Sequence, residues 1–325
     1  MSAPFDAVLL VAFGGPQGPD DVRPFLANVL RGRRVSPERV EEVAHHYERF
    51  GGVSPLTELT MKQARALESA LAARGLPLPV HVGMRNWHPF LTDTLTEMSR
   101  RGRQRAIGLL AAAQRSYSGC TQYRENVRDA RVAVRQSGMQ PPDIVYVADW
   151  HEHPGFIEAN ADHVRRAFDR LPAAVRDRAR LIFTAHSIPL AMAQKYPYET
   201  NLRTSARLIA EATGRSDWAL VYQSRSGRPE DPWLEPDVCD YLRRERAAGL
   251  EAAVLCPVGF LCDHVEVLYD LDVEAADTCR ESGIAMARAE AVNVHPRFID
   301  ALADAVAQTY ERYRRGRPLS LIPPA

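Results

Sequence analysis

A histidine stands where a buried strand is expected to end. Residues 181–185 form an apolar run, His186 follows it directly, and Pro189 then prevents the strand from continuing. In open parallel sheets, ligands bind outside the carboxyl ends of the strands. A neutral imidazole at such a place can bind a divalent metal or accept a proton. Taken alone, a histidine such as His186 is more often a hydrogen-bonded structural residue than a functional one.

Three carboxylates follow a second strand of the same kind at regular spacing. Residues 254–260 contain that strand and its turn, and Glu266, Asp270 and Glu274 then recur every four residues. On a helix this spacing places them in one row that drifts about 40° per step. A solvated acidic stripe near a helix N-terminus is one explanation, and a path for a divalent cation is the other. The presence of His186 in the same half favours the cation path.

Aromatic residues are concentrated in loops of the first half. Residues 13–22 follow the first strand, but the early proline and the missing third glycine separate this loop from the GxGxxG dinucleotide fingerprint. A loop that lines a cleft is favoured there over a simple turn or a nucleotide site. The loops at 47–56, 86–90 and 116–123 all carry aromatic rings. Together they predict an aromatic-lined cleft for a large flat ligand.

The composition is that of an ordinary enzyme. The 325 residues include 41 basic and 41 acidic side chains, so there is no overall charge to attract nucleic acid or an anionic membrane. No apolar run approaches the roughly 18–20 residues that span a bilayer, and no signal peptide is visible, so we expect a cytoplasmic protein. The five cysteines include no CxxC pair, which indicates reduced thiols.

Short apolar runs alternate with longer amphipathic stretches along the whole chain. The expected strands are residues 7–13, 80–84, 105–110, 144–148, 181–185, 218–223, 252–258 and 284–288. Helical patterns fall at 60–74, 153–171, 201–213 and 297–313, and the tail 318–325 is expected to be irregular. This β-then-α alternation predicts an α/β fold of two similar doubly wound domains, each with a parallel four-stranded sheet.

These segments also make the chain recognisable, because it resembles the ferrochelatases over nearly its whole length. The matching segments are residues 13–16, 50–55, 85–89, 185–189, 222–227 and 257–274. Several blocks in the same order are far more specific than any single motif. Residues 28–33 and 233–237 are similar to the actinobacterial-type branch, whose members act in the coproporphyrin-dependent route to haem.

The resemblance implies two Rossmann-like domains of the class II chelatase kind, with a porphyrin held between them. It implies residues 1–150 as the domain lining the porphyrin cleft, 151–296 as the domain carrying the metal residues, and 297–325 as a C-terminal helix and tail. It also implies insertion of Fe²⁺, as a substrate, into coproporphyrin III with release of two pyrrole protons. The alternatives are protoporphyrin IX as substrate, a cobalt or nickel chelatase, and a non-catalytic tetrapyrrole-binding protein.

The same resemblance suggests roles for individual residues. His186 and Glu266 would be catalytic and would bind the metal, while Asp270 and Glu274 would pass iron inward. The porphyrin would contact Ser54, Tyr123, Phe13, Tyr47, Trp87 and His264. Some relatives have a tyrosine that can ligate the metal at the tip of the first strand, where this chain has a phenylalanine.

No permanently bound cofactor is expected. Cluster-bearing ferrochelatases have several cysteines in a C-terminal extension, whereas the last residues here contain none. A [2Fe–2S] centre normally needs four thiolates, and Cys120 alone does not supply them. The resemblance therefore implies no iron–sulfur cluster, and we expect a monomer without a nucleic-acid partner or a transmembrane segment.

Overall fold

The chain forms two four-stranded parallel sheets. The computed structural model describes residues 3–32, 35–226 and 231–316, so the expected irregular tail at 318–325 lies outside the described residues. The strands are β1 (Ala7–Ala12), β2 (Val80–Met84), β3 (Arg105–Leu110), β4 (Asp143–Tyr146), β5 (Arg180–His186), β6 (Trp218–Gln223), β7 (Ala252–Cys256) and β8 (Ala285–Arg288). Their orders are β2-β1-β3-β4 and β6-β5-β7-β8, and every pairing is parallel. The predicted fold class is confirmed, and each strand was placed within two residues of its observed ends.

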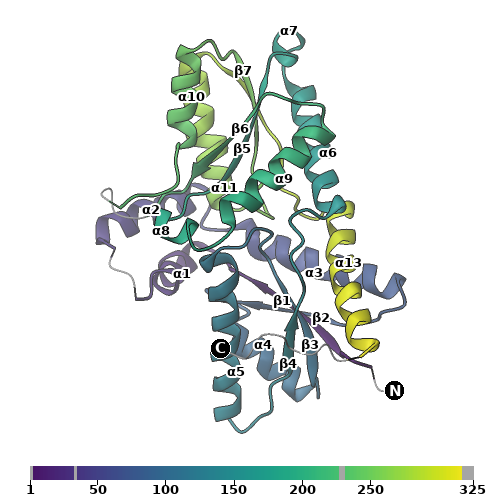
Figure 1. The fold of residues 1–325 in the computed structure, drawn as a ribbon. Coiled ribbons are helices and arrows are strands. Elements are labelled where there is room, and N and C mark those ends of the chain that lie inside the picture. Colours follow the sequence, from purple (N-terminus) through teal and green to yellow (C-terminus); the bar gives the residue numbers. More distant parts are fainter. Residues whose placement is uncertain (1–2, 33–34, 227–230, 317–325) are drawn as a thin grey trace.

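Helices cover both faces of each sheet, stacked as an upper and a lower lobe in Figure 1. The lower lobe contains α1 (Val22–Val29), α2 (Pro37–Arg49), α3 (Pro55–Ala73), α4 (Leu91–Arg100) and α5 (Gln122–Gln136). The upper lobe contains α6 (Pro154–Arg170), α7 (Ala173–Arg176), α8 (Leu190–Ala193), α9 (Tyr198–Ala212), α10 (Val238–Ala247), α11 (Val265–Tyr269) and α12 (Ala276–Ser282), and α13 is Pro296–Arg314. Three short helical turns are η1 (Pro19–Asp21), η2 (Tyr117–Thr121) and η3 (Asp270–Ala275).

Strand β1 shows why these apolar runs become central strands. All six of its side chains are buried, as a parallel strand covered on both faces requires. Val8 and Leu10 pack in the cluster with the α3 residue Leu67, whereas Leu9 joins the α4 residue Leu95 on the other face. This period of two distributes one apolar run between two hydrophobic layers.

The two lobes share one hydrophobic core. The largest cluster of buried side chains runs from β1 and α3 to β5 and β7. Helix α13 packs against α3 of the lower lobe and α6 of the upper lobe, as its course along one side of Figure 1 shows. At its start, a Cβ on Gly155 would lie 2.3 Å from the Arg297 carbonyl oxygen, so only glycine allows this approach of α6 and α13. The expected segment 297–325 thus begins with a helix that ties the lobes together, and the division after residue 150 remains a prediction.

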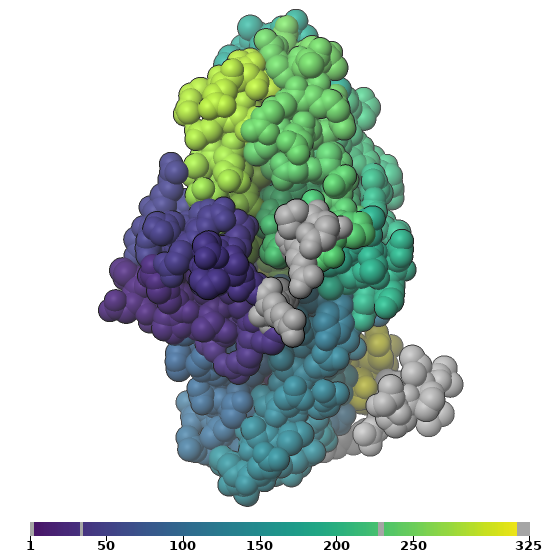
Figure 2. Space-filling model, turned by 90° about the vertical axis from the view of Figure 1, so that its left-hand side faces the viewer, coloured from purple at the N-terminus to yellow at the C-terminus, as the bar shows by residue number. Residues whose placement is uncertain are grey.

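The carboxyl ends of the two sheets face each other. From the lower lobe, Gln114 Nε2 donates to the Val258 carbonyl at 3.3 Å after β7. Thr121 Oγ1 lies 3.3 Å from the hydroxyl of Tyr196, which follows β5. Figure 2 shows α1 and α2, in purple, covering one side of this junction. Any site built on the strand ends therefore has walls from both lobes.

Among the described helices, none is both long and apolar enough to cross a membrane.

Candidate functional site

The strand order identifies where a ligand should bind in the upper sheet. In the order β6-β5-β7-β8, the chain leaves β5 for β6 on one side and later returns to β7 on the other side of β5. The crevice outside the carboxyl ends of those two strands is the topological switch point, where open α/β sheets bind ligands. His186 is the last residue of β5, and Glu266 lies in α11, the first helix after β7, so both border this point.

His186 is held in one orientation by its neighbours. Its Nδ1 lies 2.5 Å from the Ser187 carbonyl oxygen, and since a carbonyl only accepts, Nδ1 carries the proton. The Tyr198 hydroxyl donates to the His186 carbonyl at 3.1 Å and so anchors the backbone. In the neutral imidazole the Nε2 lone pair is then free, and a carbonyl partner on Nδ1 is the usual arrangement behind a metal-binding histidine.

Glu266 faces that lone pair. Its Oε2 is 4.0 Å from His186 Nε2, and the two side chains are 42% and 34% exposed. Val265 and Val267 on either side are buried, so the helix must direct Glu266 away from the core. His264 caps this helix, because its Nδ1 accepts from the Val267 amide at 3.3 Å. Burial lowers the pKa of His264, which favours the neutral imidazole.

The row of acids does not lie on one regular α-helix, and that part of the expectation is wrong. Helix α11 ends at Tyr269 and continues as a π-helical segment, Asp270–Ala275, before α12 begins. Its i→i+5 hydrogen bonds widen the turn between Asp270 and Glu274. The π turn depends on contacts that the four-residue spacing does not report, so periodicity alone predicted a uniform helix.

Asp270 is the most perturbed carboxyl group of the row. Ser224 Oγ donates to its Oδ2, and Gln223 Nε2 donates to the same oxygen at 3.1 Å. Burial, with smaller contributions from the charges of Glu266 and Glu274, raises the pKa of Asp270 to about 7 despite these hydrogen bonds. The row therefore contains a carboxyl group that exchanges a proton near neutral pH.

The outer end of the row approaches the lower lobe. Burial is also the main cause that raises the pKa of Glu274, and the charged groups near it include Asp237, Arg39 and Glu42. Arg39 and Glu42 belong to α2. Near the same place the His46 ring of α2 stacks on Tyr269, with centroids 3.6 Å apart. The acids thus extend from the His186–Glu266 pair toward the surface next to α2.

The expected aromatic residues of the first lobe gather around one ring that the sequence analysis missed. Phe13, Tyr47 and Trp87 each make an edge contact with Phe25, with centroids 6.2, 5.7 and 6.3 Å away. Phe25 is buried on α1, and Val265 of the upper lobe joins the same cluster. The amphipathic pattern of residues 22–29 was the available signal for Phe25.

Ser54 and Tyr123 are both buried, at 3% and 6% exposure. Ser54 caps helix α3, since its Oγ accepts from the Leu56 amide at 3.4 Å. The guanidinium of Arg85 lies over the Tyr123 ring at 5.1 Å and over Phe13 at 5.6 Å. Arg85, at the end of β2, is a second residue of this wall to which the sequence analysis assigned no role.

A separate group of metal-ligating side chains lies at the junction of α6 and α13. Among the described residues, Asp162, His163 and His295 are close enough together to bind an ion. Protein atoms already contact several of their ligand atoms. His163 Nδ1 donates to the Glu290 carbonyl, while His295 accepts from the Arg297 amide and donates to Asp162 at 3.2 Å. Within this group, His295 therefore serves as the N-cap of α13.

Comparisons with known proteins agree with this geometry. The Ferrochelatase family model matches residues 5–310. The chain is 49% identical to a ferrochelatase of Rhodopirellula baltica over 94% of this chain and 86% of that one. It is 48% identical to a coproporphyrin III ferrochelatase of Streptomyces coelicolor, with the same two coverages. A third relative, a coproporphyrin III ferrochelatase of Mycolicibacterium smegmatis, is 46% identical over 93% of this chain and 89% of that one.

Solved structures with much lower identity share the fold. A structure of SirB from Bacillus subtilis with Fe³⁺ superimposes with a TM-score of 0.57 at 12% identity, covering 95% of this chain and 97% of that one. The multi-domain protein DR2241 from Deinococcus radiodurans gives 0.54 at 15% identity over 93% of this chain and 55% of that one. Two facing doubly wound sheets, a histidine and a glutamate at the switch point, and a family match over nearly the whole length lead to one conclusion: the chain belongs to the ferrochelatase family.

Proposed function

We propose that this protein inserts Fe²⁺ into coproporphyrin III. The observation that carries the chemistry is the His186–Glu266 pair, an imidazole Nε2 and a carboxylate oxygen facing each other at 4.0 Å. A metal–ligand distance of about 2.1 Å lets one cation contact both atoms. Family membership supports iron as the metal and a porphyrin as its acceptor.

The reaction needs two proton acceptors as well as a metal route. Fe²⁺ forms bonds to four porphyrin nitrogens, and the two pyrrole N–H bonds break and release two protons. We assign these protons to His186 Nε2 and the Glu266 carboxylate, which can accept them once iron has left these atoms for the porphyrin nitrogens. Both side chains are partly exposed and can return the protons to water. A planar porphyrin hides its nitrogen lone pairs in the ring plane, so the walls from both lobes would hold it bent.

The acidic row is proposed as the route for iron. Glu274 interacts with the charges of Arg39 and Glu42 on α2, and Asp270 lies between Glu274 and Glu266 along the chain. Carboxylate oxygens suit a hard or borderline divalent cation. Because the pKa of Asp270 is about 7, its carboxyl group would release a proton when a cation arrives and take it back when the cation leaves.

The wall of the lower lobe is proposed to receive the porphyrin. Phe13 and Trp87 are partly exposed members of the Phe25 cluster and offer apolar surface to a flat ring. Ser54, Tyr123 and Tyr47 are buried behind that surface, so we assign them to support of the wall and of the porphyrin rim. His264 is proposed to border the ring beside Glu266.

The choice of coproporphyrin III rests on relatives. Those from Streptomyces coelicolor and Mycolicibacterium smegmatis are coproporphyrin III ferrochelatases, whereas the one from Rhodopirellula baltica is described only as a ferrochelatase. Coproporphyrin III carries four propionates and protoporphyrin IX two, so their binding differs in polar demand. The two porphyrins are therefore to be compared directly as substrates.

The test is anaerobic incubation of the purified protein with Fe²⁺ and each porphyrin, followed by absorption spectroscopy. We expect coproporphyrin III to have the higher kcat/KM. A preference for protoporphyrin IX would contradict the substrate, and porphyrin binding without insertion of iron would indicate a tetrapyrrole carrier. Faster insertion of Co²⁺ or Ni²⁺ than of Fe²⁺ would indicate a different chelatase.

We also propose that the protein carries no iron–sulfur cluster and acts as a cytoplasmic monomer. All five cysteines are free thiols, and burial raises the pKa of Cys262 and Cys279 to about 12, which disfavours the thiolate that binds metals. Acid-labile sulfide in anaerobically purified protein would contradict the first statement. A molar mass of twice 36.3 kDa by light scattering would contradict the monomer.

A further inference from the structure

Arg288 occupies an unusual position behind the acidic row. It is the last residue of β8, the strand next to β7 in the upper sheet. Its side chain is only 13% exposed and lies between the loop that leads into α11 and the π-helical segment. Nothing in the proposed reaction uses this buried cation directly.

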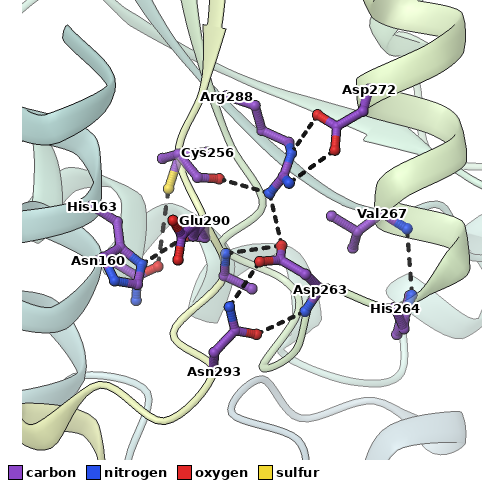
Figure 3. A network of polar contacts seen from close by, with 12 residues as sticks. Asn160, His163, Cys256, Asp263, His264, Val267, Asp272, Arg288, Glu290 and Asn293 are labelled. Atoms are coloured by element: carbon purple, nitrogen blue, oxygen red, sulfur yellow. Dashed lines mark hydrogen bonds and ion pairs between the residues drawn. The ribbon is translucent and has the colours of Figure 1, made fainter. Parts of the chain in front are cut away.

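The Arg288 guanidinium joins the loop before α11 to the π-helical segment, as Figure 3 shows. On one side it forms a two-pronged ion pair with Asp272, from Nε to Oδ1 at 2.6 Å and from the second terminal nitrogen to Oδ2 at 2.9 Å. On the other side it donates to Asp263 Oδ1 at 2.7 Å. Such forks add geometric definition as well as binding energy.

Asp263 is itself fixed on every side. Its Oδ1 also accepts from the Ala291 amide at 3.1 Å, and its Oδ2 accepts from Asn293 Nδ2 at 2.7 Å. Its backbone amide donates back to Asn293 Oδ1 at 2.9 Å. The Asn293 carbonyl then accepts from Gln63 Nε2 of helix α3 at 2.7 Å. One hydrogen-bonded network thus runs from Asp272 to the lower lobe.

We propose that Arg288 is a positioning residue, which holds the carboxylates of the acidic row in the geometry that binds iron by joining Asp263 to Asp272. The inference rests on the function proposed above for that row. Asp263 precedes Glu266 by three residues, and Asp272 lies between Asp270 and Glu274 in the π-helical segment.

The acidic row needs such support because the interactions within it are unfavourable. Three carboxylates at four-residue spacing repel one another, and π-helical geometry is rare and is kept by its surroundings. Without Arg288, Asp263 and Asp272 would have no cation between them and the segment could shift relative to β5 and His186. Among the described residues, the hydrogen bonds of this network do not include the Phe13, Phe25 or Trp87 rings of the aromatic wall, so the surface offered to the porphyrin should be unaffected.

The test compares Arg288→Lys with Arg180→Lys. Lysine keeps the charge but cannot form the fork. Arg180 is the matched control, because it is also poorly exposed and also joins two carboxylates, Asp217 at 2.9 Å and Glu245 at 2.6 Å. It lies at the opposite, amino end of β5, away from the acidic row.

We expect Arg288→Lys to raise the KM for Fe²⁺ about 10-fold, the range found for residues that orient metal ligands. The KM for the porphyrin should stay within about twofold, and Arg180→Lys should change neither. An unchanged KM for Fe²⁺, or equal changes in both variants, would overturn the assignment. If Arg288→Lys does not fold, Asp272→Asn removes the same fork from a more exposed position and decides in the same way.

A metal-binding measurement separates this inference from the proposed reaction. Titration with Co²⁺ alone, in the absence of porphyrin, should give an approximately 10-fold weaker Kd for Arg288→Lys than for the unaltered protein. If no porphyrin is metallated but this difference is present, the proposed function fails and the role of Arg288 stands. If Co²⁺ binds both proteins equally, or neither, the role of Arg288 is refuted.

Discussion

Replacing Asp270 with asparagine should change how stability depends on pH. Asparagine keeps the shape and an oxygen that can accept from Ser224 and Gln223, but it cannot ionise. In the folded protein burial raises the pKa of Asp270 from the ordinary 3.8 to about 7. Among the described residues, Gln223 Oε1 has no hydrogen-bond partner, so a protonated Asp270 could also donate to a flipped Gln223 amide.

The sign follows from proton binding in the two states. Between about pH 4 and pH 7 the folded protein keeps the Asp270 proton and the unfolded chain does not, so stability falls as pH rises. The stabilisation that comes from this bound proton is fully present below about pH 4 and is lost above about pH 7. At 1.36 kcal/mol per pKa unit, the window from pH 5 to pH 7 corresponds to about 3 kcal/mol. Asp270→Asn has no such loss.

Urea unfolding at pH 5, 6, 7 and 8, with a chelator present to remove metal ions, measures this effect. The free energy of unfolding of Asp270→Asn, relative to the unaltered protein, should increase by about 3 kcal/mol from pH 5 to pH 8. Asp277→Asn is the control, because Asp277 lies one helix further on and pairs at the surface with Arg280. If the difference in free energy of unfolding between Asp270→Asn and the unaltered protein stays constant with pH, Asp270 does not hold a proton in the folded protein and the reasoning is refuted.

Three further predictions concern the pair and the wall. His186→Ala and Glu266→Ala should each lower kcat for iron insertion at least about 100-fold. The Tm should change little, since both side chains are partly exposed. Near-normal turnover in either variant would contradict the assignment, and His45→Ala on the surface of α2 is the control. Ser54→Ala should lower the free energy of unfolding in urea by about 1 kcal/mol, because it removes the cap of α3. Tyr123→Phe should raise the KM for coproporphyrin III more than it lowers kcat in steady-state assays, and the reverse order would place Tyr123 outside the porphyrin wall.

The amino-acid sequence by itself determined the strands and the main chemistry. A run such as that of β1 buries every side chain, as a parallel strand covered on both faces requires. His186 could be placed at a strand end because the apolar run stops there and Pro189 follows. Local pattern was sufficient for these features, since they depend on residues that are neighbours along the chain.

Only the tertiary structure decided how the acids are held. The hydrogen bond from Ser224 to Asp270 and the ion pairs of Arg288 join residues 16 to 46 positions apart. Periodicity carries information about which face a residue occupies, but none about which distant side chain meets it there. The pKa of Asp270 near 7 has the same origin. The Asp270 carboxyl becomes buried next to the end of β6 only when the chain has folded.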